Sequence, residues 1–158
     1  MKGFFDMNKF LKGEKNVLLF LLFLILLFIL WGRYLICEMT IEMHTKNLET
    51  LKDRILCVES FGWQVDHGSE LCENMRIPEK FNDVYENYNN FLKSGGFDLS
   101  EYKGKVISKY TYIITNPPLS NNEPYYAVLF VYENQMIGGN VFSPTIDGRM
   151  MHIRRRSE

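Results

Sequence analysis

Side chains that commonly carry catalysis or bind metals are few in this chain and form no recognised constellation. The histidines are His44, His67 and His152. Cys57, Asp66, His67 and Cys72 lie close together along the chain, but their spacing matches no standard set of metal ligands. Because a metal site needs three or four converging ligands, we predict that the protein holds no metal and no other cofactor.

The motif Ser100-Glu101-Tyr102-Lys103 has the spacing of the reactive serine and lysine in penicillin-recognising enzymes. The companion Lys-Thr-Gly motif of those enzymes is absent, so Ser100 is better interpreted as a cap or turn residue. Asp98 and Asp147 also suit turns rather than an acid–base pair. We therefore predict a protein that is not an enzyme. The alternative is a small hydrolase-like envelope enzyme, whose candidate catalytic residues would be Cys72, His67 and Ser100.

The overall composition is that of a folded chain with balanced charge. Its 158 residues are 46% hydrophobic, and 18 Lys and Arg stand against 19 Asp and Glu. This hydrophobic content is too high for a disordered chain, and three cysteines are too few for a disulfide scaffold. Cys57 and Cys72 could still form a disulfide outside the cell, which would add about 3 kcal/mol in the chain-entropy model. The net charge of −1 gives no reason to expect nucleic acid as a partner.

The apolar residues are concentrated near the N-terminus. Residues 17–30 contain no polar side chain, whereas an amphipathic surface helix would have a polar face. Extended to residue 36, the run reaches the roughly 20 residues, about 30 Å of helix, that cross a bilayer. We interpret 17–36 as a retained signal anchor, because no small-residue cleavage site follows it. A cleaved signal peptide is the alternative.

Flanking charges predict how this anchor is oriented. Four lysines precede it, whereas only Arg33 and Lys46 lie at its C-terminal side over a similar distance. Since cytoplasmic flanks collect Lys and Arg, we expect the N-terminus in the cytoplasm and the rest outside. The predicted segments are a basic flank at 1–16, the anchor at 17–36, a stalk or helix continuation at 37–46, an extracytoplasmic domain at 47–153 and a basic tail at 154–158.

The domain is predicted to contain two helices. The first is capped by Thr45 or Asn47 and ends before Gly62. The second begins at Pro78, which is favoured in a first helical turn, and ends at Gly95-Gly96. The apolar residues of the second helix recur at helical spacing: Phe81, Val84, Tyr85, Tyr88, Phe91 and Leu92.

The rest of the domain has the patterns of β-strands. The expected strands are 106–114, 125–132 and 136–142, with a turn at 133–135. Trp63 and Val65 alternate as in a short strand, and 71–77 gives an indecisive strand pattern. Gly138-Gly139 inside a strand indicates a bulge or a close backbone approach. The predicted class is α+β: after the transmembrane helix, two helices pack on an antiparallel sheet, in the order α-β-α-β-β-β.

Five segments of the domain carry a resemblance through their order and spacing. They are SFGWQV (60–65), IPEKFNDVYENYN (77–89), GFDLSEYKGK (96–105), YTYII (110–114) and VYENQMIGGNVFSPTIDGRMMH (131–152). Together they resemble the bacterial family known as domain of unknown function 4830, over about residues 47–153. The resemblance implies a Bacillota-type envelope protein and brings no activity. Candidate interaction or family-motif positions are Gly62, Trp63, Pro78, Tyr85, Tyr88, Asp98, Tyr102, Gly104, Gly138, Gly139, Asp147 and Gly148.

These observations predict a single-pass protein of the cell membrane whose extracytoplasmic domain is a non-enzymatic binding, sensing or interaction module. Its expected partners are the lipid bilayer, through residues 17–36, and an envelope protein or ligand that the residues do not identify. A further alternative is a regulatory or inhibitory subunit of a neighbouring membrane protein.

Overall fold

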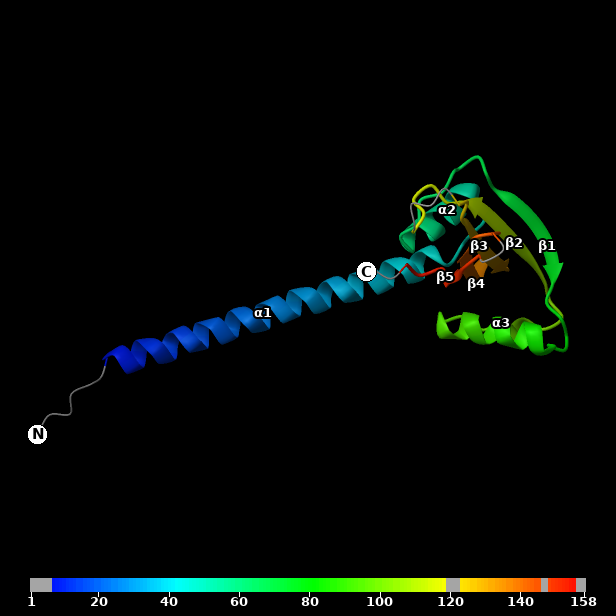
Figure 1. Cartoon of the computed structure of the whole chain (residues 1–158). Coiled ribbons are helices and arrows are strands. Elements are labelled where there is room, and N and C mark those ends of the chain that lie inside the picture. Colours follow the sequence, from blue (N-terminus) through cyan, green and yellow to red (C-terminus); the bar gives the residue numbers. More distant parts are fainter. Residues whose placement is uncertain (1–6, 119–122, 146–147, 156–158) are drawn as a thin grey trace, which may run out of the picture. The chain divides into compact units, whose positions relative to one another are not determined.

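A computed structural model of the chain describes residues 7–118, 123–145 and 148–155 (Figure 1). Two compact units are present, one ending at Met39 and one beginning at Thr40. The elements, in chain order, are α1 (Met7–His44), α2 (Leu51–Ser60), β1 (Leu71–Arg76), α3 (Asp83–Ser94), the 3₁₀ helix η1 (Leu99–Tyr102), β2 (Val106–Ile113), β3 (Tyr126–Tyr132), β4 (Gln135–Phe142) and β5 (Met150–His152). The predicted α+β class is confirmed.

Helix α1 contains the apolar run that was expected to cross the membrane. Among the described residues, it is the one helix long and apolar enough to do so, through Leu19–Ile36. No part of that stretch is buried inside the protein. Of the two options for residues 37–46, the helix continues as far as His44.

The second unit is a five-stranded antiparallel sheet with a helix on each face. The strands lie in sequence order, β1-β2-β3-β4-β5, and α2 and α3 cover opposite faces (Figure 1). The expected order lacked β5, because three residues are too few to show an alternating pattern. The expected strand at Trp63–Val65 is only a single bridge from Val65 to Ile114, whereas the indecisive segment at 71–77 forms β1.

Helix α2 starts later than predicted because a reciprocal capping box fixes its first turn. Thr50 Oγ1 accepts the backbone N–H of Asp53 at 3.2 Å, and Asp53 Oδ2 accepts the N–H of Thr50 at 3.1 Å. This arrangement satisfies two backbone donors that a helix start otherwise leaves unpaired. The cap is therefore Thr50, and the predicted caps Thr45 and Asn47 are wrong.

Helix α3 also starts later than predicted, at Asp83 rather than at Pro78. Asn82 caps it, since its Oδ1 accepts the backbone N–H of Tyr85 at 2.9 Å. Pro78 lies in the connection that precedes the helix. The predicted end at Gly95-Gly96 is confirmed, and Gly96 has φ +93°, which a side chain would disfavour.

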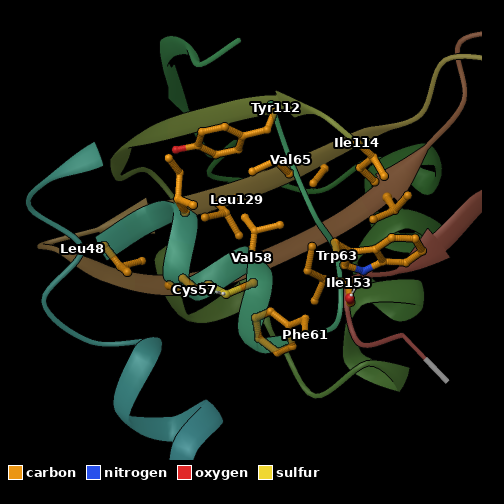
Figure 2. Close-up of a cluster of buried hydrophobic side chains, with 14 of the residues drawn as sticks. Leu48, Cys57, Val58, Phe61, Trp63, Val65, Tyr112, Ile114, Leu129 and Ile153 are labelled. Atoms are coloured by element: carbon orange, nitrogen blue, oxygen red, sulfur yellow. Dashed lines mark hydrogen bonds between the residues drawn. The ribbon is translucent and has the colours of Figure 1, made fainter. Parts of the chain in front are cut away.

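The α2 side of the sheet carries the larger of two hydrophobic clusters (Figure 2). Cys57 and Val58 of α2 are fully buried there against Leu129 of β3. The indole N–H of Trp63 donates to the carbonyl oxygen of Ile153 at 2.5 Å. This hydrogen bond holds the segment after β5 against the same core.

The α3 side carries the second cluster, and glycines let its elements approach closely. A Cβ on Gly138 would lie 3.2 Å from the Phe130 ring and 3.3 Å from a methyl carbon of Leu99. Gly139 faces the α2 side instead, and a Cβ there would lie 2.6 Å from the carbonyl oxygen of Val128. The strand pairing also shifts register after Phe130, so both predicted features, a bulge and a close approach, occur here.

A polar network crosses the α2 side of the sheet. Arg54 Nε and Nη2 donate to the two carboxylate oxygens of Glu70 at 2.9 and 2.8 Å, and Nη1 donates to the carbonyl oxygen of Glu49 at 2.8 Å. The hydroxyl of Tyr112 also donates to Glu70. Burial favours the neutral form of Glu70, but hydrogen bonds from Arg54 and Tyr112 outweigh it, so the pKa lies below its ordinary value.

We expect Glu70→Ala to lower the free energy of unfolding by about 2–4 kcal/mol, because it leaves the buried Arg54 guanidinium without its carboxylate partner and two of its donors without an acceptor. The matched control is Glu73→Ala, which removes a carboxylate from a more exposed pair with Lys109 and should cost less than about 1 kcal/mol. Urea unfolding of the full chain in detergent, followed by tryptophan fluorescence, measures both values.

The same experiment has a pH dependence with a definite sign. A folded-state pKa below the ordinary value of 4.5 means that the unfolded chain binds the proton more readily, so ionised Glu70 stabilises the fold above that pH. The difference between wild type and Glu70→Ala should be full at neutral pH and shrink as the pH falls through the folded-state pKa. Equal losses in the two variants would contradict the assignment.

Candidate functional site

The Ser-x-x-Lys motif does not form a reactive pair. The Ser100 hydroxyl donates to Asp98 Oδ1 at 2.6 Å, whereas Lys103 Nζ lies over the ring of Phe81, 4.5 Å from its centroid. Asp98 caps η1 and also accepts a hydrogen bond from Asn89 at 2.9 Å. The hydrogen bonds from Ser100 and Asn89 hold the pKa of Asp98 well below its ordinary value. Ser100 and Asp98 are therefore parts of a helix cap, as the turn interpretation predicted.

The other two candidate catalytic residues make contacts of a different kind. His67 Nε2 lies 3.7 Å from a carboxylate oxygen of Glu59, with the histidine side chain mostly exposed. Cys72 is exposed on β1. Among the residues that the structure describes, no hydrogen bond or ion pair joins Cys72, His67 and Ser100. The described part of the chain also contains no group of three or more His, Cys, Asp or Glu that could hold a metal.

In the structure Cys57 and Cys72 are both free cysteines. Cys57 points into the core, where its Sγ lies 3.7 Å from Met136 Sδ, whereas Cys72 is exposed on the edge strand β1. Burial raises the pKa of the Cys57 thiol to about 12. Cys57 is thus a core residue with little thiolate character.

Several family-motif positions build the framework. The carbonyl oxygen of Gly62 accepts hydrogen bonds from Asn116 Nδ2 at 3.2 Å and from Arg155 Nη1 at 3.3 Å. The Arg155 guanidinium lies over the Trp63 ring, 4.8 Å from its centroid. These contacts hold the end of α2, the loop after β2 and the C-terminal segment together.

Three more of these positions lie in turns or in aromatic packing. Gly104 donates its N–H to the carbonyl oxygen of Ile77 at 2.9 Å, and Gly148 donates to Thr145 at 2.7 Å. Tyr102 packs against Tyr132 with ring centroids 5.6 Å apart. Asp147 lies outside the described residues.

The structure reveals a surface that the sequence did not indicate, on the side of the sheet that α3 covers. Four residues from four successive strands pair across the sheet: Ile113, Tyr126, Phe142 and Met150. We call this set the apolar row. Ile113 is 41% exposed and Met150 49%, while the rings of Tyr126 and Phe142 stack between them with centroids 5.5 Å apart. The row is thus a continuous apolar strip that reaches solvent.

The next row of the same face shows why the apolar row is open. There α3 sits on the sheet: the Tyr88 hydroxyl donates to Asn140 Oδ1 at 2.8 Å, and Phe91 stacks on His152 with ring centroids 4.4 Å apart. Val84, one turn before Tyr88, is 76% exposed. The helix therefore covers one row and leaves the adjacent one accessible.

Tyr85 and Tyr88, two of the candidate positions, hold α3 in this place. Tyr85 packs on Phe81 with ring centroids 4.7 Å apart and meets Tyr88 edge to face at 6.3 Å. Burial raises the pKa of Tyr88, so its hydroxyl stays protonated and donates to the buried Asn140. Sequence spacing found both tyrosines, but the apolar row comes from cross-strand pairing and includes Met150, which lies in no predicted element.

The fold and its surface define an α+β domain that follows a helix able to cross a membrane. A family model described as domain of unknown function (DUF4830) matches residues 57–141, which is more than half of the chain. The chain therefore belongs to this family, as the resemblance predicted, and the match runs from α2 to β4. No curated protein and no solved structure matches the chain.

We expect Tyr88→Phe to lower the free energy of unfolding by about 1–3 kcal/mol, because the Oδ1 of the buried Asn140 loses its donor. Tyr85→Phe is the matched control: its hydroxyl makes no hydrogen bond within the described protein, so the change should stay within about 0.5 kcal/mol. Urea unfolding of the full chain compares them. A Tyr85→Phe loss as large as that of Tyr88→Phe would contradict the role given to this hydrogen bond.

Proposed function

We propose that the protein is a single-pass membrane protein whose domain, on the outer side of the membrane, is a non-enzymatic binding module for another envelope protein. The observation that carries this proposal is the apolar row. Exposed apolar strips of this kind on soluble domains commonly mark interaction sites. Two of the candidate catalytic residues, Ser100 and His67, contact other groups of the fold rather than one another.

The extent of the apolar row suits a protein surface. It crosses four strands, and three spacings of about 4.8 Å make roughly 14 Å. On the same face, Val128 and Phe130 are buried. Ile113 and Met150 are exposed because they lie in the row that α3 does not cover. A partner that covered these side chains would gain about 25 cal/mol of binding free energy for each Å² of apolar surface removed from water.

Charge and anchoring favour a protein of the envelope over other partners. Residues 38–158 carry 13 basic and 17 acidic side chains, an excess of negative charge that disfavours nucleic acid and anionic lipid headgroups. On the same face of the sheet as the apolar row, the ion pair between Lys109 and Glu73 at 2.8 Å is internally neutral. An anchor in 17–36 would hold the domain close to other membrane proteins and so raise their effective concentration.

The proposed topology makes Cys72 reactive from outside the cell. In a Cys37→Ser chain expressed in intact cells, a membrane-impermeant maleimide should label Cys72, which is exposed, and not Cys57, which is buried with a raised pKa. Mass spectrometry of the labelled chain locates the adduct. Adding Cys72→Ser should abolish labelling. Labelling that requires cell lysis would place the domain in the cytoplasm and refute this topology.

The apolar row should contact the partner directly. A photoreactive residue at Met150 of the full chain should give a discrete protein adduct on illumination of intact cells, seen as a band shift on a denaturing gel. The matched control is Leu51, an exposed apolar residue of α2, on the opposite side of the sheet. A second change, Ile113→Asp, should weaken the Met150 adduct at least fivefold, because it puts a charge in the row.

The binding proposal fails if Met150 gives no discrete adduct, or if Leu51 gives the same one. It also fails if Ile113→Asp leaves the adduct unchanged while the variant remains folded. Tryptophan fluorescence of each variant reports on folding.

A further inference from the structure

The outer edge of β1 is a second surface, separate from the apolar row. β1 pairs with β2 through six consecutive residues without a register shift, and no strand of the described residues pairs with its other side. In Figure 1, β1 forms the outermost arrow of the sheet. The opposite edge, β5, has only three residues. β1 is therefore the longer and more regular of the two edges.

Two hydrogen bonds show which backbone groups of β1 point outward. Ile77 donates its N–H to Lys105 at 2.9 Å, and Asp66 donates its N–H to the carbonyl oxygen of Ile113 at 2.9 Å. In an antiparallel pair, the backbone N–H and C=O groups of successive residues point alternately toward and away from the partner strand. Since Ile77 points toward β2, the backbone groups of Leu71, Glu73 and Met75 do so as well. The backbone N–H and C=O groups directed away from the sheet are then those of Cys72, Asn74 and Arg76.

The polar side chains of β1 contact β2 or the residues just before it, rather than blocking the outer edge. Glu73 pairs with Lys109 of β2 at 2.8 Å, and Asn74 Oδ1 accepts a hydrogen bond from Ser108 at 3.2 Å. Arg76 Nη1 donates to the carbonyl oxygen of Gly104 at 2.8 Å. All three partners lie on β2 or just before it. Proteins usually protect edge strands with lysine, proline or bulges, and β1 contains none of these.

We propose that the outer edge of β1 binds an extended segment of a partner protein, which adds to the sheet as a sixth strand. The backbone of Cys72, Asn74 and Arg76 supplies the hydrogen bonds, as in other cases of strand addition. On the α3 side, exposed Leu71 and half-buried Met75 would lie beside the incoming strand. The segment should therefore carry β-branched or aromatic residues at alternate positions.

A partner segment fits this edge better than a second copy of the chain does. A strand of six residues is about 20 Å long, and two such edges paired alone cover far less than the roughly 800 Å² per partner of a stable complex. A flexible segment needs less area, because other contacts of the partner, including those on the apolar row, add to its affinity.

The test uses a capped, fluorescein-labelled peptide that copies residues 106–113, because β1 already pairs with this side-chain order on its inner edge. Fluorescence anisotropy measures its binding to the full chain in detergent. Asn74→Pro removes an outward N–H and keeps the pairing with β2, so it should weaken binding at least tenfold. Asn74→Ala keeps the backbone and should change binding less than twofold. A peptide with proline at alternate positions is the negative control.

Each result decides the proposal. Peptide binding that Asn74→Pro removes and Asn74→Ala retains supports strand addition. No binding, or binding that Asn74→Pro leaves unchanged, overturns it. Self-association of the full chain that Asn74→Pro abolishes would make a second copy the occupant and also overturn it. The Met150 adduct should persist in Asn74→Pro, so failure of this proposal is distinguishable from failure of the apolar row.

Discussion

The rest of the domain depends on one buried cation. Arg54 is 8% exposed, and taking a guanidinium out of water costs several kcal/mol unless its donors are satisfied. Here Glu70 takes two of them in a forked pair, the Leu48 and Glu49 carbonyl oxygens take another, and the Tyr110 ring covers the cation at 4.2 Å. Because Glu70 immediately precedes β1, this pair also positions the start of the edge strand relative to α2.

The two faces of the sheet are covered to different extents, and this difference produces the proposed binding surface. On one side α2, Trp63 and Ile153 close the core. On the other side α3 has 12 residues, about 18 Å of helix, and sits over Asn140 and His152. In the row of Phe130, the missing side chain of Gly138 leaves room for Leu92 of α3 and Leu99 of η1. Helix α3 does not cover the neighbouring row, and its end residues Ile113 and Met150 stay in contact with solvent.

The length of each apolar pattern explains which elements could be predicted from the sequence. Helix α3 and strands β2 and β3 are long enough for their apolar patterns to be distinct. These predicted elements are confirmed. The helix starts were predicted at Thr45 or Asn47 and at Pro78, because those residue types are favoured there in general. The side chains that reach the free backbone donors are those of Thr50 and Asn82, and only the three-dimensional arrangement selects among such candidates.

Local sequence patterns are enough to predict that α1 is long and apolar enough to cross a membrane, that the class is α+β and which family the chain belongs to. These properties depend on apolar runs, periodic spacing and the order of motifs along the chain. The apolar row, in contrast, arises only from tertiary contacts. Ile113 and Met150 are 37 positions apart in the sequence. They belong to one strip only because four strands pair side by side. The free edge of β1 likewise follows from its place at the end of the strand order. Both are properties of contacts between distant segments, which a local pattern does not encode.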